Sequence, residues 1–209
     1  MSILKVARLG HPAVRRAAEP VAREAIRTPA LQRLIDDMVE TMHEYDGVGV
    51  AAPQVYAGLR LAVIEVPAAR AREEGPQDER RRIDSDAADD ERSEAGVPLT
   101  VLVNPVVTPL GSRRAAGYEG CLSVPDLRGL VRRFDRLRLE ALDRGGKAYS
   151  LEASGFFARV IQHECDHLEG LVYLDRMDDM QSLSFLREFE RFGAASAPED
   201  EEQPARSRR

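Results

Sequence analysis

Residues 162–167 read Gln-His-Glu-Cys-Asp-His, and this stretch decides how the rest of the chain is interpreted. His163 and His167 are four residues apart, so on a helix their imidazoles lie on one face and can reach the same metal ion. Glu164 lies one step round the helix, close to that ion but angled away from it, which suits a base acting on a metal-activated water. Two histidines can also decorate an ordinary helix. However, the chain has only 4 histidines and two of them fall in this frame, so the pattern favours a metal site.

The sequence around these residues predicts a helix over residues 154–169. It contains no proline and no glycine after Gly155, while Ser154 is a suitable N-cap and Gly170 a suitable C-terminal stop. Apolar side chains recur at helical spacing at Phe157, Ile161, Cys165 and Leu168. Cys165 lies about 160–200° round the helix from the two histidines, so we expect it to pack in the core and not to bind the metal. With both faces in use, the helix should lie buried in the middle of the domain.

A third metal ligand has to come from elsewhere in the chain. The common zinc peptidases take it from downstream, but no histidine follows Gly170. Glu188 and Glu190 look like exposed charges, paired with Arg187 and Arg191, on a predicted amphipathic helix over 183–192. The predicted packed side of that segment comprises Met180, Leu183, Leu186, Phe189 and Phe192.

Two candidate ligands lie upstream. His43 ends a predicted helix over residues 29–44, where the helix dipole already accounts for a histidine. Cys121 lies in residues 119–123, Glu-Gly-Cys-Leu-Ser, and a thiolate is a good ligand for iron, zinc or cobalt. An arbitrary cysteine is more often a small buried hydrophobe. The residues alone leave both roles of Cys121 open.

Three segments in this order resemble the peptide deformylase family: residues 47–54 (Gly-Val-Gly-Val-Ala-Ala-Pro-Gln), 119–123 and 162–167. The resemblance runs from about residue 3 to residue 192. It implies that Cys121, His163 and His167 bind one divalent metal and that Glu164 is the general base and acid. It also implies that Gln54 and the backbone N–H of Leu122 stabilise the oxyanion, and that the Gly49 backbone contacts the substrate. Val50, where leucine is commoner, and Cys165, in the variable position of the histidine motif, are small departures that touch no chemical role.

The implied reaction is hydrolysis of the N-formyl group of formyl-methionine on nascent polypeptides, with release of formate. The resemblance favours Fe²⁺ as the metal, with Zn²⁺, Ni²⁺ or Co²⁺ as other occupants of a mixed sulfur and nitrogen site. Val48, Phe156 and Val160 are candidates for an apolar methionine pocket, although packing explains them equally well. Arg128 is a candidate contact to the peptide further along. Glu119 is a candidate acceptor that orients a ligand histidine.

Composition limits the class of protein. A chain of 209 residues with net charge −6 has the length of one domain, which we place at 1–192, and the acidic excess falls largely in residues 68–96. That segment is expected to be a flexible charged insertion with a short helix at 79–83 as an option, and residues 193–209 a disordered tail. The remainder is nearly neutral, which argues against a nucleic-acid site. No apolar run has membrane-spanning length and no secretory signal is evident, so we expect a cytoplasmic protein whose partners are nascent peptides, at the ribosome or free of it.

Alternating apolar patterns predict strands at 61–66, 101–104, 106–110, 117–121, 136–142 and 148–151, with a hairpin turn at 145–146. Strands followed by helices indicate an α+β fold. We expect mixed or antiparallel sheets packed around the central metal-binding helix, with an N-terminal and a C-terminal helix. Two other functions stay open: a zincin-like metallopeptidase in which Cys121 is incidental, and a catalytically silent paralogue that binds peptides without turnover.

Overall fold

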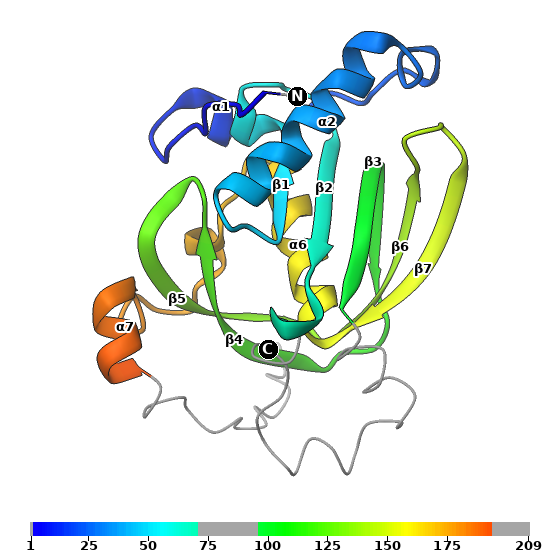
Figure 1. Cartoon of the computed structure of the whole chain (residues 1–209). Coiled ribbons are helices and arrows are strands. Elements are labelled where there is room, and N and C mark those ends of the chain that lie inside the picture. The colour runs from blue at the N-terminus through cyan, green and yellow to red at the C-terminus, as the bar shows by residue number, and fades with distance from the viewer. Residues whose placement is uncertain (1, 71–95, 194–209) are drawn as a thin grey trace, which may run out of the picture.

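The computed structural model describes residues 2–70 and 96–193 (Figure 1). The helices are α1 (Pro12–Arg15), α2 (Pro29–Glu44), α6 (Gly155–Leu168) and α7 (Leu186–Phe192), with short 3₁₀ turns η1 (Arg23–Ala25), η2 (Ala52–Val55) and η3 (Tyr173–Arg176). The strands are β1 (Gly49–Ala51), β2 (Leu61–Val66), β3 (Val97–Pro109), β4 (Arg114–Cys121), β5 (Val124–Phe134), β6 (Arg136–Leu142), β7 (Ala148–Ser154) and β8 (Ser184–Phe185). The optional helix at 79–83, most of the charged insertion at 68–96 and the tail beyond residue 193 lie outside the described residues.

The strands form two antiparallel sheets. A 5-stranded sheet has the order β1-β2-β3-β6-β7, and a 3-stranded sheet has the order β4-β5-β8. Val63 on β2 lies opposite Val101 on β3, and Leu139 on β6 lies opposite Leu151 on β7. This arrangement of antiparallel sheets with separate helices confirms the predicted α+β fold.

Strand β2 is covered on both faces, and this places the two long helices. Leu61 and Val63 join one core with α2, while Ala62 and Ile64 join a second core with α6. Burial on both faces explains why β2 is a nearly continuous apolar run. The 5-stranded sheet therefore lies between α2 on one side and α6 on the other (Figure 1). No helix in the described part of the chain is long and apolar enough to cross a membrane.

Helix α2 follows its predicted bounds. Thr28 caps it, because the Thr28 hydroxyl accepts a hydrogen bond from the backbone N–H of Leu31, and Pro29 occupies the first turn. The buried side chains of α2 recur at helical spacing toward the sheet: Leu31, Ile35, Met38 and Met42.

Helix α6 is buried on both faces, as predicted. Ala158, Ile161 and Leu168 pack in the core with the 5-stranded sheet, and Cys165 packs against the same core. Gly170 ends the helix with a φ of 74°, a left-handed conformation that favours glycine. The prediction for Ser154 is wrong in one respect, because it occupies the N-cap position but its hydroxyl makes no capping hydrogen bond.

One strand of the structure was predicted as two, and another was not predicted. The predicted strands at 101–104 and 106–110 are one strand, β3, with a register shift between Val103 and Val106. Asn104 has a φ of 51° there, and its side-chain amide accepts from the N–H of Val21 and donates to its C=O. Pairing with β6 resumes at Val106. Strand β5 was missed because a proline and two glycine or aspartate breaks interrupt its pattern, yet it pairs with β4 from Val124 to Phe134.

The C-terminal segment differs from its prediction. Residues 184–185 form strand β8 beside β5, and α7 begins only at Leu186. Phe189 packs against the ring of Tyr118 with 4.5 Å between centroids, but Met180 and Phe192, which were predicted to pack, are about 60% exposed. Glu188 and Glu190 are exposed as predicted, and within the described residues no ion pair joins them to Arg187 or Arg191.

Candidate metal centre and active site

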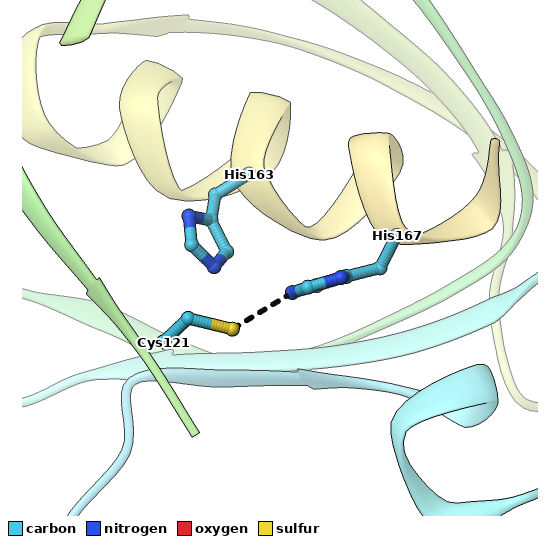
Figure 2. Close-up of side chains that lie close together, drawn as sticks. All are labelled: Cys121, His163 and His167. Carbon is cyan, nitrogen blue, oxygen red and sulfur yellow. Dashed lines mark hydrogen bonds between the residues drawn. The ribbon is translucent and has the colours of Figure 1, made fainter. Parts of the chain in front are cut away.

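Cys121, His163 and His167 come together between β4 and α6 (Figure 2). One sulfur and two ring nitrogens, one atom from each residue, all lie within 4.8 Å of one another. The Cys121 Sγ and the His167 Nε2 are 3.3 Å apart. A soft thiolate and two imidazoles suit a first-row divalent metal such as iron, zinc or cobalt. The three residues that the resemblance implied as ligands are therefore placed where they could hold one ion.

The turn after β4 presents the Cys121 sulfur. Cys121 lies opposite Val124 in the β4–β5 pairing, so Leu122 and Ser123 make a tight turn. The Ser123 N–H donates to the Cys121 Sγ at 3.4 Å. Burial alone would raise the pKa of this thiol, but the nearby His167 and a hydrogen bond from His163 lower it well below its usual value. The site therefore favours the thiolate, the form that binds metal.

His163 is oriented by Glu119. The His163 Nδ1 lies 2.9 Å from the Glu119 Oε2, so Nδ1 carries the proton and Nε2 is left as the ligand atom. Burial alone would raise the pKa of Glu119, but hydrogen bonds from His163 and Arg133 hold it well below its usual range. Glu119 is thus an ionised acceptor for the His163 Nδ1 proton, the contact for which it was named as a candidate.

His167 has a different environment. It is 1% exposed, and its Nδ1 has no hydrogen-bond partner within the described part of the chain. Its other nitrogen faces Cys121. Both ligand rings stand nearly perpendicular, with 5.0 Å between centroids and 79° between planes. The two rings come from neighbouring turns of α6, and one nitrogen of each lies within 4.8 Å of the other and of the Cys121 sulfur.

Glu164 lies near Cys121, His163 and His167, and one of its carboxylate oxygens is available for a further hydrogen bond. It is 4% exposed, and its Oε2 has no hydrogen-bond partner among the described residues. Burial raises the pKa of Glu164 to about 7, against the effect of His163 and His167. A buried carboxyl with a pKa near neutrality can both accept and return a proton.

Gly49 on β1 makes the space for Glu164. A Cβ on Gly49 would lie 2.4 Å from the Glu164 Oε1 and 2.7 Å from its Cδ. Contacts that short do not occur in folded proteins, so any larger residue at 49 would displace the carboxylate. This steric role of Gly49 was not foreseen from the sequence.

Gln54 is fixed so that its amide nitrogen faces the centre. Its Oε1 accepts from the Ala51 N–H at 2.8 Å, which assigns the other end as Nε2. That Nε2 donates to the Ser123 Oγ at 3.3 Å and to the Cys121 Sγ at 3.5 Å. Gln54 is 2% exposed, so its orientation is set inside the protein and not by solvent.

A cavity of about 410 Å³ opens over the metal centre. The residues named from the sequence as substrate contacts all line it: Val48, Gly49, Arg128, Phe156 and Val160. Strand β1 ends the 5-stranded sheet and strand β4 ends the 3-stranded sheet, and residues of both strands line the cavity. The cavity is therefore bordered by two strand edges that could pair with an extended peptide.

The other sequence candidates lie elsewhere. The His43 Nε2 is 2.5 Å from the Glu65 Oε2 on the surface, and Cys165 is in the core, so neither belongs to the ligand group. Reasoning from the sequence did not identify Arg133 and Arg159, whose buried guanidinium groups both bond Glu119. It left Asp166 without a role, and in the structure Asp166 bonds Arg133 and Arg176. To place Arg133 near Glu119 from the sequence, one would have had to predict strand β5 and its pairing with β4.

Comparison with known proteins gives consistent matches. The family model described as Polypeptide deformylase matches residues 3–183. Peptide deformylase 1 of Bordetella pertussis is 42% identical over 180 residues, which cover 86% of this chain and 90% of that protein. Peptide deformylase 3 of Streptomyces avermitilis is 44% identical over 181 residues, which cover 87% of this chain and 74% of that protein.

Solved structures match as well. The class I type b peptide deformylase from Acinetobacter baumannii, bound to Met-Ala-Ser, has a TM-score of 0.69 and 33% identity, covering 85% of this chain and all of that one. Peptide deformylase from Ehrlichia chaffeensis has a TM-score of 0.71 and 30% identity, covering 87% of this chain and 91% of that one.

Proposed function

Because the chain belongs to the peptide deformylase family, we propose that it removes the N-formyl group from formyl-methionine at the start of nascent polypeptides and releases formate. Water adds to the formyl carbon, the carbon–nitrogen bond breaks, and a proton goes to the nitrogen to give a free amine. The observation that carries the proposal is the buried Glu164 carboxylate, which lies beside Cys121, His163 and His167 at the cavity.

Cys121, His163 and His167 are the residues that would hold the metal. When bound, a divalent ion supplies Lewis acidity at this point and lowers the pKa of the attacking water. We assign Fe²⁺ as the native ion, since the family resemblance favours iron and the mixed sulfur and nitrogen donors accept it, along with Zn²⁺, Ni²⁺ and Co²⁺. Metal analysis of protein prepared without oxygen tests the assignment, and iron below zinc in such material would contradict it.

Glu164 moves the proton. Its Oε2, which has no hydrogen-bond partner in the part of the chain that the structure describes, can take a proton from the attacking water and return it to the departing nitrogen. Positioned proton transfer of this kind contributes about 10²–10⁴ in rate. Burial supports this role, because a carboxylate whose pKa is raised to about 7 takes up a proton more readily than an exposed one and, near neutral pH, is still acidic enough to return it.

Gln54 and Leu122 stabilise the oxyanion. The Gln54 Nε2 already points at the centre, and the Leu122 N–H belongs to the tight turn directly after Cys121. A donor fixed in advance does not have to reorganise as charge develops on the formyl oxygen. Support for this assignment comes from the Ala51 N–H, which holds the Gln54 amide in one orientation.

The substrate peptide lies extended between β1 and β4. The Gly49 backbone and the edge of β4 would bond its main chain, as in strand addition. Val48, Phe156 and Val160 form an apolar pocket for the methionine side chain, and Arg128 meets the peptide further along. The Acinetobacter relative is bound to Met-Ala-Ser, the sequence of a deformylated product, which supports a peptide in this place.

We place the reaction in the cytoplasm, on chains emerging from the ribosome. Both cysteines are free thiols in the described structure. Cys121 has to stay reduced to bind metal, which suits a reducing compartment. Formylated amino ends occur on chains that are still being made, so the substrate itself supports this location.

Formate release from formyl-Met-Ala-Ser by anaerobically purified, metal-loaded protein tests the function. We expect turnover by the wild type, and from Glu164→Gln a loss of about 10²–10⁴ in kcat with metal content unchanged. Absence of formate from fully metal-loaded wild type would contradict the proposal. Peptide binding without turnover would instead indicate a silent paralogue, and full activity of Cys121→Ala would indicate a zincin-like enzyme.

A further inference from the structure

Asp166 lies on α6 between the proposed base and the second ligand histidine, but it does not face the cavity. It is 7% exposed, and its carboxylate is shared by two arginines. Arg176 on η3 donates to it twice, from Nε at 3.0 Å and from Nη2 at 2.6 Å. Arg133 on β5 donates to it from Nη1. A carboxylate this deeply buried and this fully bonded has a fixed position.

Arg133 divides its guanidinium between two carboxylates. Its Nε and Nη2 donate to the two oxygens of Glu119 at 2.9 and 3.0 Å, while its Nη1 donates to Asp166. Arg133 is 5% exposed, so water does not substitute for either partner. The plane of the guanidinium is therefore set by both carboxylates at once.

Glu119 connects this arginine to the metal centre. Its Oε2 accepts from the His163 Nδ1, and its Oε1 also accepts from Arg159, one helical turn before His163. Arg159 donates to the carbonyls of Ala115 and Gly117 on β4 as well. A continuous series of bonds thus runs from His163 through Glu119 and Arg133 to Asp166.

We propose that Asp166 is a positioning residue for the metal centre, acting on His163 through Arg133 and Glu119. Two physical effects carry this role. Asp166 holds Arg133 in the plane that lets it bond both oxygens of Glu119, and so fixes the oxygen that His163 meets. It also takes part of the positive charge of Arg133, which leaves Glu119 a stronger acceptor for the His163 proton and His163 a stronger donor to a metal.

The rival interpretation is that Asp166 only stabilises the fold. Removing one partner of a buried ion pair is destabilising whatever the pair does. A stability measurement therefore cannot separate the two roles, but the ligand field of a bound metal can. It responds to the donor strength and angle of His163 and not to the global free energy of unfolding.

The test uses the full chain loaded with Co²⁺ as a spectroscopic probe. For Asp166→Asn we expect the visible ligand-field bands to shift and the dissociation constant for Co²⁺ to rise about tenfold, the lower end for loss of an outer-shell partner. Arg176→Gln, at the half-exposed end of the network, should change both in the same direction but less. If Asp166→Asn fails to fold, Arg176→Gln serves as the test of the proposal in its place. Glu169→Gln is the matched control, because Glu169 follows the same helix and pairs with Arg60 without bonding Arg133.

Two results would overturn the proposal: folded Asp166→Asn, or in its absence Arg176→Gln, binding Co²⁺ with the wild-type spectrum and affinity, or Glu169→Gln changing both as much. The proposal rests on the metal site put forward above but not on formate release, since every readout is metal binding. Failure of the wild type to release formate would therefore not contradict the role of Asp166. Normal formate release together with unchanged Co²⁺ spectra in the variants would contradict the role of Asp166 but not the proposed function.

Discussion

At the scale of single residues, Gln54 is expected to affect the chemical step and not the binding of substrate. Its amide nitrogen is fixed toward the centre by the Ala51 N–H. For Gln54→Leu we expect kcat for formyl-Met-Ala-Ser to fall about 10²–10³-fold, because one preorganised oxyanion donor is lost, with little change in KM. Steady-state formate release measures both constants.

The control for Gln54 is Ser123→Ala. Ser123 accepts from the same amide nitrogen but offers no donor to the reacting oxygen in the proposed mechanism. We expect its kcat to stay near that of the wild type. A wild-type kcat for metal-loaded Gln54→Leu would remove Gln54 from the mechanism.

The two cysteines should differ in reactivity once metal is removed. Burial raises the pKa of Cys165 to about 12, whereas the two histidines hold the pKa of Cys121 well below its usual value against the effect of burial. Only thiolates are alkylated at a useful rate. In chelator-treated protein at pH 8, iodoacetamide should modify Cys121 and leave Cys165 intact, as peptide mass spectrometry can show. Equal labelling of both would contradict the assigned environments.

At the scale of secondary-structure elements, Gln162 fixes α6 to the end of β5. Its Oε1 accepts from the Phe134 N–H at 3.0 Å and its Nε2 donates to the Phe134 C=O at 2.9 Å. Gln162→Ala leaves both backbone groups partly buried and unpaired, so we expect a loss of about 1–3 kcal/mol in the free energy of unfolding. Urea titration followed by circular dichroism measures it. Gln181→Ala, at an exposed position, should change stability little, and a comparable loss there would show that the Phe134 contacts are not the cause.

Helices whose own sequence carries a cap and an apolar periodicity could be predicted, whereas a strand that depends on pairing with another strand could not. Helix α2 carries its own cap and stripe, and α6 its own periodicity, so both were predicted nearly to the residue. Strand β5 depends on its pairing with β4, which no local pattern encodes. Since Arg133 lies on β5, the network around Glu119 was missed with it, although Glu119 itself was named. Met180 was assigned to a packed face because its spacing fits a helix, but the residue is 60% exposed.

At the scale of the whole molecule, the metal centre joins parts of the chain that are far apart in sequence. Cys121 belongs to the β4–β5 sheet, while His163 and His167 belong to the helix that packs on the other sheet. A metal bound by all three binds the folded state alone, and so stabilises it by about 2.7 kcal/mol when its free concentration is 100 times Kd.

Metal removal should therefore lower the melting temperature. We expect the Tm of chelated wild type to rise steadily as Zn²⁺ or Co²⁺ is added back, and that of Cys121→Ser to respond weakly. Differential scanning fluorimetry across a metal titration measures this. A Tm independent of metal in the wild type would mean that the three residues do not bind the ion together.

The close approach of Gly49 and Glu164 has a consequence for how the two positions can evolve. The carboxylate occupies the volume that any side chain at 49 would need. While Glu164 stays in this position, we expect a side chain at 49 to be selected against, because it must push the carboxylate out of its place. We therefore expect the residue tolerated at one position to depend on the residue at the other, although they lie on different elements. A descendant with a side chain at 49 must hold the Glu164 carboxylate elsewhere, so this glycine marks lineages that keep the carboxylate where it lies here.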